Sequence, residues 1–373
     1  MLKSFTVSNF KAFEKPVTID FSATGNYTFN TEAVKDGIVK TAVMYGKNAS
    51  GKSSLGLAIF DIVANLTDNF VNPRDYVIYQ NALDPKSPVS FEYHFEFSNT
   101  EVIYKYKKTN VITIIQEELI IGKKSVISYD KTEKDKGLFI DLKGAENLNT
   151  NLNALQFSAL RLVKNNCTLE ENLENNVFLQ LTTFVSKMLF FRSLQDRAFT
   201  GYKPAPSLNI VEEIIKQNNF DSLKLFFKEA GFSDELVHSN HTGREELYIK
   251  YGSIILPFEQ ACSTGMSSLL LVYYWLEDIA KEDKCPSFLC IDEFDAFYHF
   301  ELAYFVVEKL KTSNCQVLLT THNTSLFTND LLRPDCYYIC SKDKIVNAHN
   351  ATLKELRFGH NLEKLYRGGT FGK

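Results

Sequence analysis

The sequence lacks the features that mark membrane and secreted proteins. No apolar run approaches the roughly 18 residues that a helix needs to cross a bilayer, and the longest, Leu269–Leu276, belongs to a segment with amphipathic helical spacing. The first residues hold neither a long apolar core nor a cleavage site, so we expect no signal peptide. Together these absences predict a soluble, cytoplasmic protein without a membrane partner.

Paired cysteine motifs and a strong charge imbalance are also missing. The seven cysteines lie mostly in apolar segments and show no C-x-x-C spacing, which favours buried, reduced thiols. Cys336 and Cys340, with His349 nearby, are only a weak indication of a metal site. The 41 Lys and Arg residues nearly balance the 45 Asp and Glu residues, for a net charge of −4. Such a charge demands no polyanionic partner, although a basic face could still form locally.

One segment carries a phosphate-binding pattern. Gly46–Ser53 matches G-x-x-x-x-G-K-S at every fixed position, between a strand pattern (Val39–Tyr45) and a helical pattern (Ser54–Val63). Strand, glycine loop and helix in this order let backbone N–H groups face an anion. We expect Lys52 to reach the β- and γ-phosphates of a nucleotide and the Ser53 hydroxyl to bind Mg²⁺. The expected nucleotide-binding residues of this segment are Gly46, Lys47, Asn48, Ala49, Ser50, Gly51, Lys52, Ser53 and Ser54.

Strand patterns dominate the chain before about residue 145 and indicate an antiparallel meander. They cover Val89–Phe97, Val102–Tyr106, Val111–Ile121 and Ser125–Tyr129. Helical spacing follows in Leu179–Phe191 and Val211–Ala230, and strand patterns return at Leu247–Tyr251 and Ser253–Leu256, with Gly252 as the turn.

The C-terminal third alternates between helical and strand patterns. Helical patterns cover Ser267–Lys281 and Phe300–Lys311, and strand patterns cover Ser287–Ile291, Gln316–Thr320 and Cys336–Cys340. This alternation predicts a mostly parallel sheet with helices on both faces, which the strand before the glycine loop should join. We therefore expect an α/β fold in a single domain of residues 1–373. Its parts would be an antiparallel β lobe with the glycine loop (1–144), a helical insertion (145–240) and a C-terminal lobe (241–373).

Two acidic residues, Asp292 and Glu293, directly follow an apolar strand pattern. A strand that is buried on both faces presents side chains at its C-terminal end, where ligands of α/β sheets bind. There Asp292 would hold Mg²⁺, and Glu293 would polarise the attacking water as general base. Solvated carboxylates at a strand end are common, but beside a phosphate-binding loop the pair favours a catalytic role.

Two further segments fit the same site. His322 follows a strand pattern, and a histidine at a strand end can sense a γ-phosphate by donating a hydrogen bond. Ser263 and Gly265 precede an amphipathic helical pattern, where a hydroxyl and free N–H groups can contact an anion. An ordinary serine N-cap would show the same local pattern.

Taken together, these segments resemble the ABC-type ATPases of the SMC/RecF class. They look most like compact AAA-type ATPases of prokaryotic abortive-infection and restriction-associated loci, relatives of the OLD proteins. The matching segments are a strand–NF[KR]xF opening (Leu2–Phe13), a reduced signature motif (Ser263–Gly265), a Walker B motif with D-loop (Asp292–His299), a switch histidine (Thr320–Asn323) and the close of the chain (Leu365–Gly372). Cys262 stands where the signature of ABC proteins usually has leucine. The Q-loop glutamine stays open between Gln80, Gln116 and Gln195.

The resemblance implies a P-loop NTPase fold of ABC-ATPase type, with ATP and Mg²⁺ as ligands. It also implies a homodimer, or a larger assembly, in which the Lys52 loop of one copy and the Ser263 segment of another hold each ATP. Lys52, Glu293 and His322 would be the catalytic residues, and slow hydrolysis through Glu293 would release the dimer. The helical insertion would then change conformation and contact a target or partner.

The first functional hypothesis is an ATP-switched regulator in an anti-phage defence system of abortive-infection type. About fifty residues follow His322, too few for the fused Toprim nuclease domain of OLD proteins. We therefore expect a separate effector, such as a nuclease or toxin encoded nearby.

Three alternatives compete with this hypothesis. One is a DNA repair or recombination ATPase of RecF/SMC type that binds nucleic acid through lysines of the β lobe, which a solvated strand edge would explain equally well. Another is a transporter subunit, which the NF[KR]xF opening disfavours. The last is a nucleotide-holding scaffold with negligible turnover. The lysines in question are Lys105, Lys107, Lys108, Lys123, Lys124, Lys131, Lys134 and Lys136.

Overall fold

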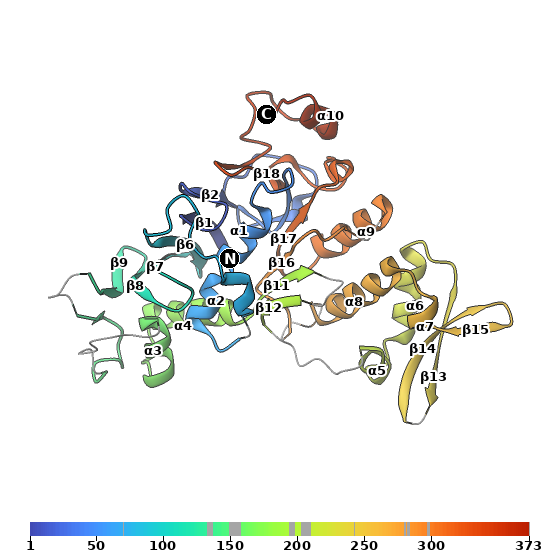
Figure 1. The fold of residues 1–373 in the computed structure, drawn as a ribbon, viewed down its shortest axis with the longest axis horizontal. Helices are drawn as coiled ribbons and strands as arrows, with labels where there is room; N and C mark the ends of the chain where they lie inside the picture. Colours follow the sequence, from blue (N-terminus) through green and yellow to red (C-terminus); the bar gives the residue numbers. More distant parts are fainter. Residues whose placement is uncertain are drawn as a thin grey trace.

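The computed structural model describes residues 1–69, 71–132, 137–148, 158–193, 198–202, 210–241, 243–279, 281, 284–296 and 299–372. The three larger sheets of the described chain follow one another across the molecule in Figure 1: an antiparallel sheet, a central sheet and a small sheet at the opposite end. The predicted α/β fold, with an antiparallel lobe and a mostly parallel core sheet, is confirmed.

The antiparallel sheet contains seven described strands in the order β10-β9-β8-β7-β6-β1-β2. Their bounds are β1 (Leu2–Ser8), β2 (Val17–Asp20), β6 (Val89–Phe97), β7 (Thr100–Lys108), β8 (Ile114–Ile121), β9 (Lys124–Asp130) and β10 (Phe139–Ile140). Every second residue of β6 is buried, as the alternation of its sequence predicts. The buried face is covered by helices α2 (Asp61–Leu66), α3 (Ala159–Asn166) and α4 (Leu173–Ser186).

The central sheet places the glycine loop. Its described strands have the order β12-β11-β16-β17-β5-β18-β19, and all neighbours between β11 and β18 are parallel. Their bounds are β5 (Thr41–Tyr45), β11 (Met188–Ser193), β12 (Ala198–Gly201), β16 (Phe288–Ile291), β17 (Gln316–Thr321), β18 (Tyr337–Cys340) and β19 (Ile345–Asn347). Because parallel strands end at the same edge, β5, β16, β17 and β18 deliver their following loops to one place.

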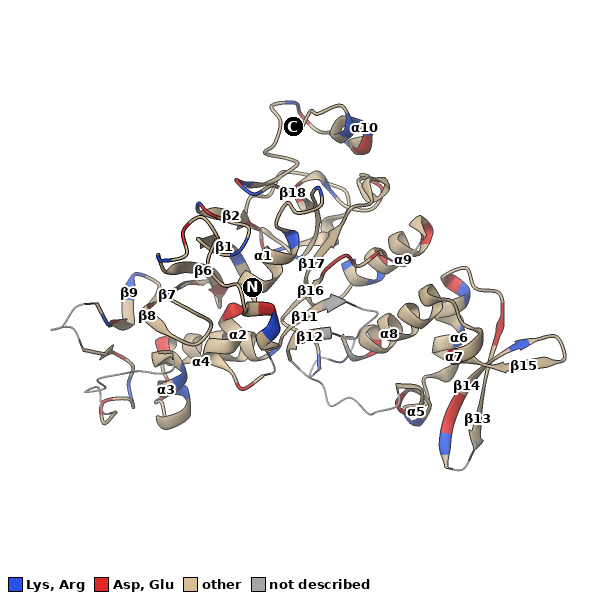
Figure 2. Ribbon diagram, viewed as in Figure 1, with Lys and Arg blue, Asp and Glu red and all other residues tan. Residues whose placement is uncertain are grey.

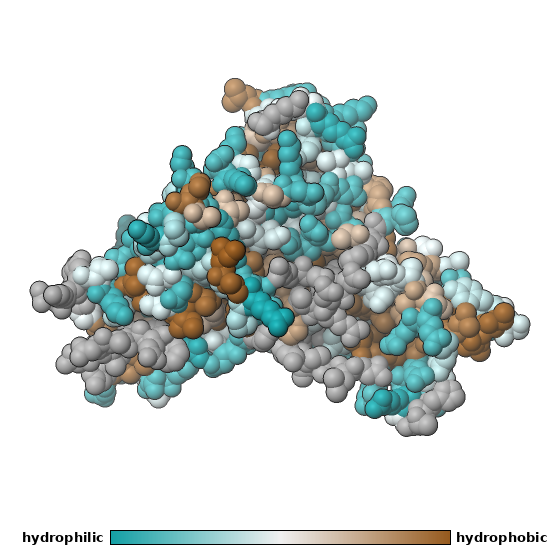
Figure 3. All heavy atoms as spheres, in the orientation of Figure 1, coloured by the Kyte–Doolittle hydropathy of each residue, from teal (hydrophilic) through white to brown (hydrophobic). Residues whose placement is uncertain are grey.

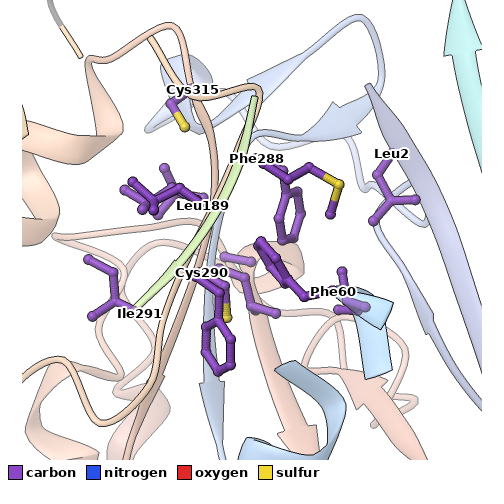
Figure 4. Close-up of a cluster of buried hydrophobic side chains, with 14 of the residues drawn as sticks. Leu2, Phe60, Leu189, Phe288, Cys290, Ile291 and Cys315 are labelled. Atoms are coloured by element: carbon purple, nitrogen blue, oxygen red, sulfur yellow. The ribbon is translucent and has the colours of Figure 1, made fainter. Parts of the chain in front are cut away.

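The core lies between this sheet and the helices behind the glycine loop. Phe60, between α1 (Lys52–Ile59) and α2, packs with its ring centroid 5.2 Å from Phe190 and 6.0 Å from Phe288. Figure 4 shows this cluster, in which Leu2 of the antiparallel sheet also takes part. The Gln316 side chain accepts a hydrogen bond from Leu2 N and donates one to Leu2 O, so the two sheets are joined by both packing and hydrogen bonds.

The predicted helix over Leu179–Phe191 and the predicted helical insertion over 145–240 are both wrong in extent. The helix expected over Leu179–Phe191 ends at Ser186, and Met188 begins strand β11. The apolar run at its end is buried inside the sheet, and a short run of this kind does not distinguish helix from strand by periodicity. The segment 145–240 is therefore not wholly helical, since it contributes β11 and β12 to the core sheet.

The other helical patterns are interrupted. The helix after the glycine loop breaks at Phe60 into α1 and α2, and Val211–Ala230 contains α5 (Ile210–Lys216) and α6 (Phe220–Glu229). Asn218, between α5 and α6, has φ 59°, a left-handed conformation that ends a helix. The domain boundaries at residues 144 and 240 stay a prediction.

The third sheet stands at the far end of the molecule (Figure 1). It consists of β13 (Glu235–His241), β14 (Arg244–Tyr251) and β15 (Ile254–Pro257), with the predicted turn at Gly252. Ile254, Ile255 and Leu256 are exposed, and Figure 3 shows the apolar surface that they form at this tip. Helices α7 (Phe258–Ala261) and α8 (Thr264–Ile279) lead back to the central sheet.

The remaining elements are short or peripheral. They are η1 (Thr31–Ala33), β3 (Val34–Lys35), β4 (Ile38–Val39), η2 (Pro73–Tyr76), α9 (Phe300–Lys311), η3 (Thr324–Leu326), η4 (Pro334–Cys336) and α10 (Leu362–Arg367). Within the described ranges, every helix is too short or too polar to cross a bilayer.

Three of the described lysines of the β lobe, Lys105, Lys108 and Lys124, are paired with acidic side chains. Lys108 is fully buried, and its Nζ lies 2.9 Å from Oδ1 of Asp61 in α2. Lys105 pairs with Glu118 at 2.9 Å, and Lys124 pairs with an aspartate at 2.8 Å. Figure 2 shows basic and acidic residues interspersed over this lobe. The expected lysines Lys134 and Lys136 lie outside the described residues.

Candidate nucleotide-binding site

The glycine loop begins directly after β5 and ends in α1. Gly51 has φ 107° and Ala49 has φ 60°, so the backbone reverses tightly before the helix. A Cβ atom at Gly51 would lie 2.7 Å from the ring of Phe13, and one at Gly46 would lie 2.8 Å from the carbonyl oxygen of Cys340. Only glycine fits these two positions, because the neighbouring chain approaches too closely for a side chain.

The start of α1 offers donors to an anion. Gly51 caps the helix without a side-chain hydrogen bond, and the first N–H groups of a helix have no intrahelical acceptor. These groups and the helix dipole favour a negative charge at this point. The Ser50 hydroxyl is buried and has no partner among the described residues, so it is a further free donor in the loop.

Lys52 is buried, and its ammonium group is directed toward the loop. Its Nζ donates to Gly46 O at 2.9 Å and lies 3.1 Å from Nε2 of His322. Burial lowers the pKa of Lys52, while the thiol of Cys340 and the carboxylates of Asp292 and Glu293 act in the opposite direction. A phosphate group would give this desolvated cation the counter-charge that the loop itself does not supply.

The two acidic residues follow β16 at the same edge. Thr320 of β17 donates its hydroxyl proton to Asp292 Oδ1 at 2.5 Å and accepts a hydrogen bond from Glu293 N at 2.8 Å. Glu293 has φ 47°, so the chain turns sharply between the two carboxylates. Asp292 is buried, whereas the Glu293 side chain is 56% exposed and free to meet a water molecule.

His322 follows β17 and completes the group. Its Nε2 lies 3.4 Å from Oε1 of Glu293 and 3.1 Å from Lys52 Nζ. Thr321 fixes the start of the loop after β17. Its hydroxyl donates to Asp295 Oδ2 at 2.7 Å and accepts a hydrogen bond from Asn323 N. Burial raises the pKa of Asp295. The structure thus brings together the three residues that the sequence marks as catalytic.

The glycine loop, Glu293 and His322 line one cavity of about 520 Å³, whereas the buried Asp292 is not among its lining residues. Glu293, His322, Lys342 and Ala12 line it together with the glycine loop and the start of α1. The loop residues on its wall are Asn48, Ala49, Ser50, Gly51, Lys52, Ser53 and Ser54. Gly46 and Lys47 belong to the loop but do not line the cavity, and their carbonyl oxygens instead accept from Lys52.

The signature segment is not part of this cavity. Ser263 caps α8, with Met266 N donating to its Oγ at 3.2 Å, and Ser263 itself is exposed. Cys262 lines a different cavity, between α5, β14 and α8. Ser263 and Gly265 therefore do not line the nucleotide cavity of their own chain. The predicted contact with a nucleotide is one to the site of another copy.

The donor set beside Lys52 fits a hard divalent cation. Ser53 presents an exposed hydroxyl at the start of α1, and Asp292 presents a carboxylate whose Oδ1 is oriented by Thr320. Hydroxyl and carboxylate oxygens are the ligands that Mg²⁺ prefers. Among the described residues no group of three or more His, Cys, Asp or Glu side chains could hold a metal, and this includes the surroundings of Cys336, Cys340 and His349.

Two of the three candidate Q-loop glutamines have other roles. Gln80 pairs with Phe10 and donates to Thr109 O, and Gln116 donates to Asp130 at 2.8 Å in the antiparallel sheet. Gln195 lies outside the described residues. Thr320, which links the two carboxylates, and Lys342, which lines the cavity, are not among the site residues predicted from the sequence. No motif marks Lys342, which reaches the site because β18 pairs with β5.

A family model matches residues 42–328, well over half of the chain, and this range includes the glycine loop, Asp292, Glu293 and His322. Its description is "AAA domain, putative AbiEii toxin, Type IV TA system". The chain belongs to this family of AAA domains. The resemblance drawn from the motifs is confirmed, and with it the assignment to the ATPases of the AAA type.

Solved structures to which the chain is similar include SMC and RecF proteins. The SMC head domain from Thermotoga maritima is 16% identical over 93% of this chain and 98% of that one, with a TM-score of 0.44. The SmcHead bound to the C-winged helix domain of ScpA is 13% identical over 92% and 97%, with a TM-score of 0.45. A RecF–ATP structure is 14% identical over 93% and 99%, with a TM-score of 0.37. No curated protein matches the chain.

Proposed function

We propose that the protein binds ATP with Mg²⁺ at the glycine loop and hydrolyses it slowly. The observation that carries this proposal is the convergence of Lys52, Glu293 and His322, from three separate segments of the chain, on one cavity. A cation that neutralises phosphate charge and a carboxylate that activates water are groups that promote phosphoryl transfer to water, and the imidazole adds a hydrogen-bond donor.

Each residue has a defined part in this reaction. Lys52 and the N–H groups of α1 neutralise the phosphates, and Glu293 accepts a proton from the attacking water. His322 donates a hydrogen bond to the γ-phosphate and holds the Glu293 carboxylate in reach. Bound between Ser53 and Asp292, Mg²⁺ would supply charge stabilisation of the phosphate oxygens.

The second half of the site comes from another copy of the chain. Ser263 and Gly265 are exposed or partly exposed at the start of α8 and away from the cavity of their own chain. We place them against the ATP of a partner subunit, so that ATP binding closes a homodimer and hydrolysis opens it. Light scattering with ATP and the Glu293→Gln variant tests this step. A mass that doubles with ATP supports it, and a mass that never changes contradicts it.

For the biological role we propose a switch in prokaryotic anti-phage defence of abortive-infection type, with a separate effector such as a nuclease. The support is the family description, which names a toxin of a toxin–antitoxin system. The pairing or burial of Lys105, Lys108 and Lys124 disfavours the alternative of a DNA repair ATPase. Expression with the neighbouring gene should protect cells from phage, and Lys52→Ala should abolish the protection. Protection that persists in this variant would contradict an ATP-dependent role.

A further inference from the structure

The cavity at the glycine loop contains one cation that the proposed mechanism does not use. Lys342 lines this cavity together with Lys52, His322 and Glu293. It lies in the turn between β18 and β19, is exposed, and forms no ion pair with any described residue. An unpaired ammonium group on the wall of an anion-binding cavity is a candidate ligand contact.

The turn that carries Lys342 has a defined position against the glycine loop. Three hydrogen bonds between Ser341 and Lys344 close the turn. Ser341 N and the Ser341 hydroxyl each donate to Lys344 O at 2.9 Å, and Lys344 N donates to the Ser341 hydroxyl at 3.1 Å. Cys340, directly before the turn, donates its thiol proton to Ser50 O at 3.6 Å, and its own carbonyl oxygen lies against Gly46. Lys342 is therefore presented from a turn that is fixed to the loop rather than from a free segment.

Sheet order determines which end of the nucleotide Lys342 faces. Strand β5 lies between β17 on one side and β18 on the other, and both pair with it in parallel. The loops after β17 and β18 therefore flank the glycine loop on opposite sides of the same edge. His322, after β17, stands with Glu293 on the γ-phosphate side, so Lys342, after β18, stands on the nucleoside side.

We propose that Lys342 binds the nucleoside side of the nucleotide, through an oxygen of the α-phosphate or the ribose. This inference rests on the proposed function, since it requires a nucleotide in the cavity. The oxygens concerned are present in both ADP and ATP, whereas His322 and Glu293 face a group that only ATP carries. Lys342 thus contributes to holding the nucleotide before and after hydrolysis.

Calorimetric titration of the full chain with ADP and with ATP tests this inference. Lys342→Ala should weaken the binding of ADP and of ATP by the same factor, roughly five- to twentyfold, as expected for a partly exposed charge-assisted hydrogen bond. Lys344→Ala, in the same turn but outside the cavity wall, is the matched control and should leave both affinities unchanged. Lys342→Arg keeps the charge and should keep most of the affinity.

Two results would overturn the inference. Affinities of Lys342→Ala equal to those of the wild type would show that the side chain makes no contact. Loss of ATP affinity alone, with ADP unchanged, would place Lys342 on the γ-phosphate side. His322→Ala provides the comparison, because it should weaken the binding of ATP and leave the binding of ADP unchanged. Absence of any nucleotide binding by the wild-type chain would overturn the proposed function itself.

Discussion

The ammonium nitrogen of Lys52 lies 3.1 Å from Nε2 of His322. The two side chains come from opposite ends of the chain and are brought together because β17 pairs with β5 in parallel. In this contact the Lys52 ammonium group donates and the imidazole nitrogen accepts, and Oε1 of Glu293 lies 3.4 Å from the same nitrogen.

His322 should act on hydrolysis more than on folding, since its side chain is 38% exposed. We expect His322→Ala to lower kcat roughly 100-fold, the lower limit of the range for loss of a positioned proton donor. The measurement is steady-state phosphate release, with His238→Ala, in the distant strand β13, as the control. Equal rates in the two variants would remove His322 from the mechanism.

Thr320 should act as a positioning residue for the two carboxylates. Its hydroxyl binds both Asp292 Oδ1 and Glu293 N, and Thr320→Val removes both hydrogen bonds while it preserves the shape of the side chain. Because Thr320 is buried and does not line the cavity, kcat should fall while the KM for ATP changes little. A parallel change in KM with kcat unchanged would contradict this role. Unfolding in denaturant should show a loss of about 1–3 kcal/mol for the unpaired buried groups.

The motifs predicted much of the candidate site. The glycine loop, Asp292, Glu293 and His322 all follow apolar strand patterns, and strands of a parallel sheet end at a common edge whatever the rest of the chain does. Their proximity could be inferred without knowing which strands are neighbours. Lys342 could not be found in this way, since its place depends on the pairing of β18 with β5, a contact between residues nearly 300 positions apart.

The limits of the fold prediction have a similar cause. The apolar run of β11 has helical spacing in sequence, but Met188, Leu189, Phe190 and Phe191 are all buried, so the alternation that marks a strand is absent. For Lys108 the sequence leaves a basic surface and a solvated strand edge open, because it does not show the partner Asp61, which is 47 residues away. In both cases tertiary contacts decide the outcome.

The Asp61–Lys108 pair should be important for stability, because it joins helix α2 to strand β7. Both side chains are fully buried, and Tyr79 and Tyr106 also donate hydrogen bonds to Asp61. Lys108→Met leaves a buried carboxylate without its cation and should cost about 3–5 kcal/mol of unfolding free energy. Lys105→Met, which breaks an exposed pair in the same strand, should cost about 0–1 kcal/mol. Similar losses in the two variants would contradict the importance of burial.

Glu117 should make stability depend on pH in the acidic range. Burial raises its pKa above the usual 4.5, although Ser158, Tyr104 and Ala159 N donate to the carboxylate. The folded state therefore holds a proton more tightly than the unfolded state, and stability falls as the pH rises from 4.5 through the folded pKa. In Glu117→Gln this loss should be absent. Chemical denaturation of both proteins between pH 4.5 and 7 measures it, and a pH-independent difference would contradict the prediction.

The most direct test of the central claim is the rate of ATP hydrolysis by the wild type, Glu293→Gln and Lys52→Ala, measured together with ATP affinity. We expect the wild type to release phosphate, and Glu293→Gln to keep its affinity while kcat falls roughly 10²- to 10⁴-fold with the loss of the general base. Lys52→Ala should lose most of its ATP binding, because the cation beside the glycine loop is gone. Equal rates in all three proteins would contradict the assignment of this site as an ATPase centre.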